Sequence, residues 1–291
     1  MMKILSDFNH IVDEEEVKQL LEKIRSNLPS KSDKELLKRI FSLIDLTTLS
    51  ERDNIENVSQ MCERVNLLGE SYPSMPVVAA ICVYPELVSV VKENLENPLV
   101  SIASVGGGFP SSQTYTNIKI MEIEQAIEQG AEEIDIVLPV GKFLMGDLEY
   151  VEYEIQIIKQ RMGPIHLKVI LETGSLQDYS AIRKASLLAI GAGANFIKTS
   201  TGKVSPGATP EAMVVMCAAI KDYYNKTGKK IGIKPAGGIS DSETAILYYA
   251  IVSEILGKDW LNSERFRIGA SRLANCLLAD IFDKGPDFGY F

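Results

Sequence analysis

Two lysines and one aspartate stand in short apolar stretches where a buried strand would normally carry nonpolar side chains. They are Lys198 in "FIKTSTGK", Lys234 in "IKPAGG" and Asp135 in "EEIDIVLP". A free lysine has a pKa near 10.4, so only about one in a few thousand is neutral at pH 7. Burial and a second ammonium nearby both favour the neutral amine, which attacks carbonyl carbons. The pair of lysines therefore indicates Schiff-base chemistry, and the spacing leaves open which lysine is the nucleophile.

These three charged residues come near the ends of separate apolar runs. Asp135 lies in the fourth run of the chain, Lys198 in the sixth and Lys234 in the seventh. In a barrel of parallel strands, the carboxyl ends of the strands meet at one mouth, where catalytic groups gather. A single buried charge is more often half of a structural ion pair, but three ionisable groups at one mouth favour catalysis.

Other polar residues fall in the same runs. On the first run, Asp45 and Thr47 lie two residues apart and therefore share a face. Cys82 on the second run is interpreted as a packing residue near the site, because no histidine partner is available to activate its thiol. His166 and Lys168 are interpreted as part of a buried structural interaction.

Three glycine-containing turns follow the last three runs, namely "STGK" (200–203), "AGGIS" (236–240) and "GAS" (269–271). Glycine lets backbone N–H groups approach an anion, and helix N-termini add partial positive charge. Barrel phosphate sites commonly use the loops after strands seven and eight. One such turn is weak evidence, but three in succession predict a phosphate site, to which Lys203 can add a full positive charge. The cluster "GGGFP" (106–110) is explained as well by a tight turn.

Eight short apolar runs must position these residues, and segments with helical spacing separate them. The runs cover residues 41–47, 76–84, 99–105, 132–139, 166–173, 194–200, 230–236 and 265–270. Eight strands that alternate with helices predict an α/β fold, the (β/α)8 TIM barrel. A doubly wound open sheet is the competing architecture, but no GxGxxG fingerprint follows the first run.

The chain of 291 residues is long enough for one large barrel domain or two small domains. We expect a single domain, in which residues 1–40 form an extension of one or two helices outside the barrel. Residues 41–279 form the barrel itself, and residues 280–291 form a tail.

Composition excludes several functions. The net charge of −9, without a dense basic patch, argues against a nucleic-acid binder, and no apolar run has the length of a membrane span. Two histidines and no CxxC pair provide neither a three-histidine zinc site nor a cysteine zinc site, so no metal or other cofactor is expected. Four widely separated cysteines are typical of free thiols in a reducing compartment, which predicts a cytoplasmic protein.

These motifs resemble those of deoxyribose-phosphate aldolase, a family of class I aldolases with a (β/α)8 barrel. They occur in order and cover residues 41–279 of the chain, as "IDLTTL" (44–49), "AAICVYP" (79–85), "EIDIVLP" (133–139), "LKVILETG" (167–174), "FIKTSTGK" (196–203), "KPAGG" (234–238) and "RIGAS" (267–271). The most specific feature is "FIKTSTGK" followed about 30 residues later by "KPAGG". Neither motif is a general feature of barrels.

The resemblance implies a role for each matching residue. Lys198 would be the Schiff-base lysine, Lys234 the lysine that perturbs its pKa, and Asp135 the proton donor and acceptor. The implied substrate-binding residues, several of them in the phosphate turns, are Asp45, Thr47, Cys82, Thr201, Gly202, Lys203, Gly237, Gly238, Gly269 and Ser271.

The implied reaction is the reversible cleavage of 2-deoxy-D-ribose 5-phosphate to acetaldehyde and glyceraldehyde 3-phosphate, in deoxyribose catabolism. It needs no metal, because an iminium group is the electron sink. The resemblance also suggests a small phosphosugar as the partner molecule, no nucleic-acid or membrane partner, and a homo-oligomer, specifically a dimer.

The chain departs from the family's pattern at two positions. Arg272 stands where the family commonly has a small hydroxyl residue, so it either strengthens the phosphate site or points outward. Tyr290, in the tail "PDFGYF", is a candidate for the family's tail tyrosine that reaches the active site. Two alternatives stay open: another Schiff-base barrel, such as a transaldolase-like enzyme, and a non-catalytic phosphosugar-binding barrel.

Overall fold

Eight parallel strands form the centre of the molecule. The computed structural model describes residues 3–285 and 288–291. The strands are β1 (Ile44–Thr47), β2 (Ala80–Val83), β3 (Ser101–Gly106), β4 (Glu133–Val137), β5 (His166–Ile170), β6 (Phe196–Lys198), β7 (Gly232–Lys234) and β8 (Ile268–Ala270). Each strand pairs in parallel with its neighbours in chain order, and β1 also pairs with β8.

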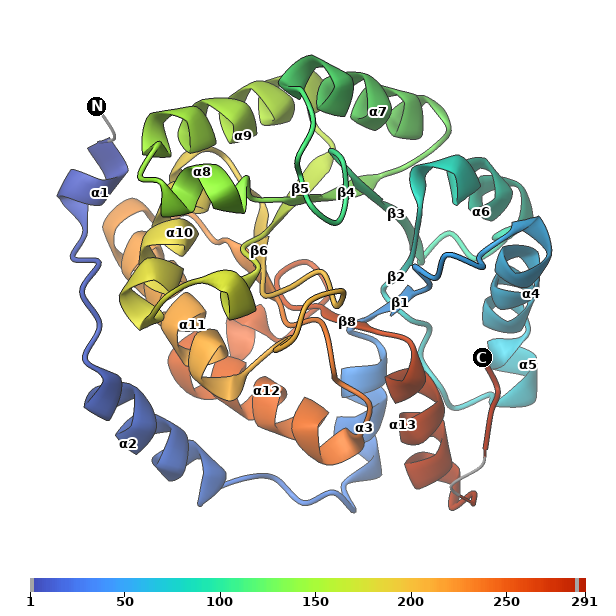
Figure 1. The fold of residues 1–291 in the computed structure, drawn as a ribbon. Coiled ribbons are helices and arrows are strands. Elements are labelled where there is room, and N and C mark those ends of the chain that lie inside the picture. Colours follow the sequence, from blue (N-terminus) through green and yellow to red (C-terminus); the bar gives the residue numbers. More distant parts are fainter. Residues whose placement is uncertain (1–2, 286–287) are drawn as a thin grey trace.

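The sheet curls into a barrel. Two isolated parallel bridges, Ile233 with Phe266 and Ala236 with Gly269, join the β7 side of the sheet to the β8 side. Figure 1 shows the strands in the centre, with a ring of helices outside them. The predicted (β/α)8 barrel is confirmed, and the doubly wound alternative is excluded.

All eight predicted runs contain a strand, but the strands are shorter than the runs. The run 194–200 shows the reason, because β6 ends at Lys198 and side chains then replace the regular ladder. The hydroxyls of Thr199 and Ser200 both donate to the Ala236 carbonyl oxygen, over 3.0 and 2.7 Å. The backbone after the strand is thereby fixed as a turn rather than as sheet.

The helices pack their apolar faces on the outside of the barrel. They are α4 (Ile55–Asn66), α5 (Leu68–Ser71), α6 (Val88–Asn94), α7 (Thr116–Glu128), α8 (Val140–Leu144), α9 (Leu148–Met162), α10 (Tyr179–Gly191), α11 (Pro210–Thr227), α12 (Ser242–Ile255) and α13 (Arg272–Phe282), with 3-10 turns at Pro85–Leu87, Thr173–Ser175 and Lys258–Trp260. Among the residues that the structure describes, none of the helices combines the length and hydrophobicity needed to cross a membrane.

Three helices precede the first strand, where the sequence predicted one or two. They are α1 (Lys3–Asp7), α2 (Glu14–Arg25) and α3 (Lys34–Phe41). Separate N-caps explain the division, because Asp13 accepts from the Glu15 backbone N–H and Asp33 from that of Leu36. In Figure 1 these blue helices lie along α10, α11 and α12, and α3 lies beside α13.

The inside of the barrel is divided between apolar and charged side chains. On one side a small apolar cluster comes mainly from β2 and β3, consisting of Leu49, Ala80, Cys82, Ala103 and Val105. The charged side chains come from β1, from β4 to β7 and from the residue before β8. Charges in a dry barrel interior are costly unless they pair, so their arrangement must be specific.

Candidate active site

Asp135 is the centre of a group of three buried lysines. Its Oδ2 atom lies 2.8 Å from Lys198 Nζ and 2.8 Å from Lys234 Nζ, and its Oδ1 atom lies 3.0 Å from Lys168 Nζ. The sheet register brings these residues together, because Lys198 pairs with Lys234 across β6 and β7, and Asp135 pairs with Lys168 across β4 and β5. The predicted convergence of Asp135, Lys198 and Lys234 is therefore present in the fold.

Further contacts extend this group into a closed ring. Lys234 Nζ lies 2.5 Å from Asp45 Oδ2, and Asp45 Oδ1 accepts from Arg267 over 2.7 Å. Arg267 also donates to Glu133 Oε1 over 2.8 Å, and Glu133 Oε2 lies 2.5 Å from Lys168 Nζ. All of these residues are at most 3% exposed. In so dry a setting, each charge depends on its neighbours.

We call these seven residues the ionic network. Its members are the cations Lys168, Lys198, Lys234 and Arg267 and the carboxylates Asp45, Glu133 and Asp135. Four potential cations face three carboxylates, so the network carries one positive charge too many if every group is ionised. A buried unbalanced charge is unfavourable, and one lysine is expected to be neutral.

The surroundings of each lysine identify the neutral one. Burial lowers the pKa of Lys198, Asp135 opposes that effect, and Lys234 lowers the pKa further, so that it stays below its usual value. Burial also acts on Lys234, but Asp135 and Asp45 outweigh it and raise the pKa of Lys234. The same carboxylates, with Glu133, raise the pKa of Lys168 despite its burial. Lys198 is thus the lysine most suited to be a nucleophile.

The carboxylates of the network stay ionised. Burial alone would raise the pKa of Asp135, but Lys168, Lys198 and Lys234 together hold it well below its usual range. Burial likewise opposes the charge of Asp45, and Lys234 and Arg267 hold its pKa low.

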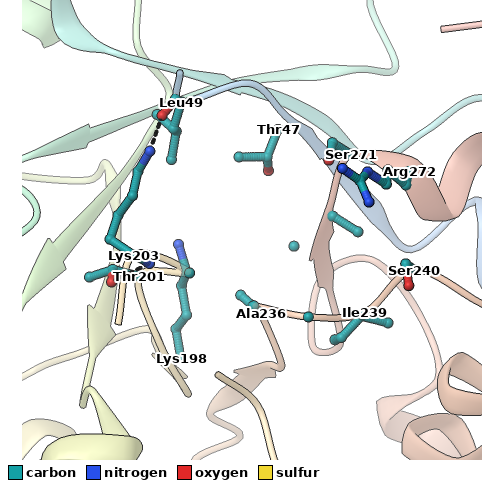
Figure 2. Close-up of a pocket in the computed structure, with 15 residues that line it drawn as sticks. Thr47, Leu49, Lys198, Thr201, Lys203, Ala236, Ile239, Ser240, Ser271 and Arg272 are labelled. Carbon is teal, nitrogen blue, oxygen red and sulfur yellow. Dashed lines mark hydrogen bonds between the residues drawn. The ribbon is translucent and has the colours of Figure 1, made fainter. Parts of the chain in front are cut away.

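A pocket of about 450 Å³ opens above Lys198 at the carboxyl ends of the strands. Figure 2 shows Lys198 rising into it between the turn of Thr201 and the strand end at Ala236. Lys234 and Asp135 are fully buried next to Lys198 and do not line the pocket. Glycine makes room for Lys234, because a Cβ atom at Gly269 would lie 2.9 Å from Lys234 Cε.

The other end of the pocket has the features of an anion site. Gly202, Gly237 and Gly238 line the pocket and have φ values of 75°, 91° and 81°, which favour glycine. Helix α13 begins beside them, and its N-cap residue Ser271 makes no side-chain capping bond. Because the first N–H groups of a helix attract anions, an uncapped first turn next to Arg272 suits a phosphate.

The two cations of the pocket lie on opposite walls. Arg272 extends from the start of α13 on the side of Ser271, as Figure 2 shows. The Lys203 ammonium reaches across the other wall and donates to the Leu49 carbonyl oxygen. Arg272 is therefore the full positive charge next to the uncapped helix, and Lys203 closes the opposite side.

Glu172 holds the turn that lines the pocket. One of its carboxylate oxygens accepts from the Thr201 backbone N–H over 3.1 Å, and the other accepts from the Thr201 hydroxyl over 2.6 Å. Glu172 itself has a φ of 54°, an uncommon conformation for a residue with a side chain. A residue keeps such a strained backbone conformation only where the surrounding structure imposes it.

We expect Glu172→Gln to weaken the binding of inorganic phosphate about tenfold, because the amide offers one acceptor where the turn of Thr201 needs two. Isothermal titration calorimetry measures this affinity. As a matched control, Asp178→Asn alters an acidic cap at the start of α10, outside the pocket lining, and should leave the affinity unchanged. Equal phosphate affinity in Glu172→Gln and the unaltered protein would contradict the role of Glu172.

The predicted binding residues fall into two groups. Those that line the pocket are Thr47, Thr201, Gly202, Lys203, Gly237, Gly238, Gly269, Ser271 and Arg272. Asp45 and Cys82 do not line the pocket and are fully buried. The Thr47 hydroxyl donates to the Asp45 backbone carbonyl oxygen, and burial raises the pKa of the Cys82 thiol, which keeps it protonated.

Tyr290 lies away from this pocket. Its hydroxyl donates to the Arg64 backbone carbonyl oxygen over 2.9 Å, and its ring packs edge-on against Tyr72. Asn275 fixes the tail by accepting from the backbone N–H groups of Tyr290 and Phe291. Apolar packing against the outer helices thus directs this tyrosine to α4 and α5 rather than to Lys198.

Sequence reasoning did not identify three members of the ionic network. From the sequence, Lys168 is interpreted as structural, and neither Glu133 nor Arg267 receives a role. Their common signal is a charged residue inside a predicted strand at an even spacing from another polar residue. Among the described residues, no three His, Cys, Asp or Glu side chains form a group that could hold a metal ion.

Comparisons with known proteins agree with this arrangement. The sequence model of the protein family described as "DeoC/LacD family aldolase" matches residues 39–259 of this chain. The human deoxyribose-phosphate aldolase is 40% identical over 257 residues, which cover 85% of this chain and 80% of that protein. A protein of Caenorhabditis elegans is 41% identical over 268 residues, which cover 91% of this chain and 88% of that protein.

A solved structure shares the fold. The tetrameric deoxyribose phosphate aldolase of Aeropyrum pernix superposes with a TM-score of 0.63 at 24% identity, over 90% of this chain and 97% of that one. The family model spans most of the chain, and the human relative is similar over most of both proteins. This chain therefore belongs to the DeoC/LacD family of aldolases, and it is an aldolase.

Proposed function

We propose that the protein cleaves 2-deoxy-D-ribose 5-phosphate reversibly to acetaldehyde and D-glyceraldehyde 3-phosphate through a Schiff base on Lys198. The observation that carries this proposal is the position of Lys198 between a network that favours its neutral form and a pocket with an anion site at its far end. The names of the relatives, which are deoxyribose-phosphate aldolases, support the substrate. Membership of an aldolase family argues against a non-catalytic phosphosugar-binding barrel.

The reaction begins at the aldehyde carbon C1 of the open-chain sugar. The neutral amine of Lys198 attacks C1, and loss of water leaves an iminium ion. The phosphate at the other end of the sugar binds at the first turn of α13, near Ser271 and Arg272. Holding both ends of the substrate restricts its motion and brings C1 to the amine.

Asp135 then moves the proton that cleavage requires. Because Asp135 is buried next to Lys198, a water molecule bridges its carboxylate to the C3 hydroxyl of the sugar. As that hydroxyl loses its proton, the C2–C3 bond breaks and its electron pair flows to the iminium, giving an enamine. Glyceraldehyde 3-phosphate leaves, C2 is protonated, and hydrolysis releases acetaldehyde and restores Lys198.

The first test compares a phosphorylated with an unphosphorylated substrate. We expect kcat/KM for 2-deoxyribose 5-phosphate to exceed that for 2-deoxyribose by at least about 100-fold, because charge-assisted contacts to phosphate are strong. In Arg272→Ser the ratio should fall about tenfold through a higher KM for the phosphate ester. Product formation is followed by a coupled assay for each aldehyde.

The unphosphorylated sugar is the internal control, because its cleavage does not use the anion site. Its kcat/KM should be the same in Arg272→Ser as in the unaltered enzyme. If neither sugar yields aldehyde products, the proposed function is refuted. A phosphate preference that survives Arg272→Ser would refute only the role of Arg272.

The setting of the reaction follows from the same proposal. We place the enzyme in the catabolism of deoxyribose from deoxynucleosides, with the phosphosugar as its partner molecule. Its free cysteines, of which Cys62, Cys82 and Cys217 are buried, support a reducing compartment such as the cytoplasm. We also propose a homo-oligomer, which the tetramer of the Aeropyrum pernix protein supports.

A further inference from the structure

Glu133 and Arg267 form an ion pair deep in the barrel that does not line the pocket above Lys198. Arg267 donates to both Glu133 oxygens, over 2.8 and 3.3 Å, and to Asp45 over 2.7 Å. The side chains of Glu133 and Arg267 are only 4% and 3% exposed. Neither residue approaches the substrate, yet each contacts a residue that in turn contacts Asp135 or Lys234.

A buried ion pair fills the interior of a barrel at a cost in free energy. Desolvation of both charges costs several kcal/mol per ion, and apolar residues of similar volume often give an equal or more stable protein. Elsewhere inside this barrel, on β2 and β3, apolar side chains fill the same kind of space. The pair contacts Asp45 and Lys168, so the charge of each of its members acts on the ionic network as well as on packing.

Asp45, Glu133 and Asp135 balance three cations, and with Arg267, Lys168 and Lys234 ionised the balance is complete without Lys198. We propose that Glu133 and Arg267 are positioning residues whose opposite charges cancel at the bottom of the barrel, so that neither disturbs this balance and Lys198 stays in its neutral, nucleophilic form. This inference rests on the proposed function, because it gives Lys198 the role of nucleophile.

The pair acts through contacts that reach Asp135 and Lys234, the neighbours of Lys198, in two steps. On one side Glu133 holds Lys168, which holds Asp135 Oδ1. On the other side Arg267 holds Asp45, which holds Lys234. Both routes end at the groups that set the charge of Lys198.

The groups that surround Lys198 come from several strands. Asp135 of β4 and Lys234 of β7 contact it or share its carboxylate partner, and Lys168 of β5 binds the other oxygen of that carboxylate. Cys82 of β2 is also close, and burial keeps its thiol neutral by raising its pKa. The balance around Lys198 is therefore set by the ionic network.

The proposal predicts pH shifts of opposite sign. Arg267→Met removes one cation and leaves three carboxylates facing Lys168 and Lys234. Lys198 then protonates more readily, because its positive charge restores the balance. The acid limb of the pH profile of kcat/KM therefore moves to higher pH. Removing the carboxylate in Glu133→Gln has the reverse effect and moves the limb to lower pH. We expect each shift to be roughly one unit, as for a nearby buried charge.

The double variant Glu133→Gln/Arg267→Met loses one positive and one negative charge, so the charges of the ionic network balance again. The acid limb of its kcat/KM should return to that of the unaltered enzyme. Arg267→Lys keeps the charge and should also retain the original limb. The matched control is Glu154→Gln, which breaks another buried pair, Glu154 with Lys119, outside the ionic network. It should lower the melting temperature without moving the limb.

Two measurements keep the outcomes separate. The pH dependence of kcat/KM for the phosphosugar tests catalysis, and the rate at which 2,4-pentanedione forms an enaminone absorbance on the protein tests the amine of Lys198 directly. Opposite shifts in the two single variants, cancelled in the double variant, support the proposal. Shifts of the same sign, or no shift in folded protein, overturn it.

Failure of the proposed function gives a different pattern. The protein then cleaves no phosphosugar, while the two single variants still shift the pH dependence of enaminone formation in opposite directions. That outcome supports the charge balance and refutes the proposed substrate. If one single variant does not fold, the other still decides, because its limb should move by about one unit and return in the double variant. A limb that stays in place in the folded single variant overturns the proposal.

Discussion

Lys198→Met should lower the cleavage of 2-deoxyribose 5-phosphate by about 10⁴-fold or more, because the variant has no amine to form the iminium on which bond cleavage depends. Methionine keeps the length and most of the volume of the lysine. The variant also removes the network's surplus cation, so Asp135 keeps two lysine partners and the fold is preserved. Melting temperature and circular dichroism test that expectation.

Trapping identifies the nucleophile independently of turnover. Borohydride added with acetaldehyde should reduce the Schiff base and leave one ethyl group on the peptide that carries Lys198. Lys203→Met, which removes the other lysine lining the pocket, should still be modified at Lys198. An adduct on Lys234 instead of Lys198, or no adduct in folded protein, would exclude the assignment.

Lys234→Leu should lower kcat/KM at pH 7 by about 10³-fold, because it removes the ammonium that disfavours the charged form of Lys198. Three carboxylates would then face only Lys168 and Arg267 as other cations, so Lys198 would protonate to balance them. An amine with a raised pKa is neutral only at higher pH. The activity of this variant should therefore increase with pH over the range where the unaltered enzyme has already reached its plateau.

The pH dependence separates the two lysines. Alkaline solution should partly rescue Lys234→Leu, whereas Lys198→Met should stay inactive at every pH. Loss of a buried partner also costs stability, about 3–5 kcal/mol, so the assay is run well below the melting temperature of the variant. Unchanged turnover of Lys234→Leu at pH 7 would show that Lys234 does not tune Lys198.

The sequence determined the barrel and the residues at its mouth. Eight β-branched runs separated by helical segments predict eight parallel strands, because local propensity and hydrophobic pattern agree along most of the chain. A lysine in the run before "TSTGK" and another before "PAGG" mark strand ends, and parallel strands bring such ends together. Strand boundaries were less well predicted, since Thr199 and Ser200 end β6 through side-chain bonds to a loop about 37 residues further along.

Only the tertiary structure decided which charged and polar groups contact each other. Arg267 meets Glu133 across more than 130 residues of sequence, Lys203 meets the carbonyl of Leu49, and Tyr290 meets the outer face of α4. The pattern of "FIKTSTGK" and "KPAGG" could not choose between Lys198 and Lys234 as the nucleophile. The choice depends on burial and on distances to carboxylates from other strands, because the ionisation of a buried group follows its neighbours in space and not its neighbours in the chain.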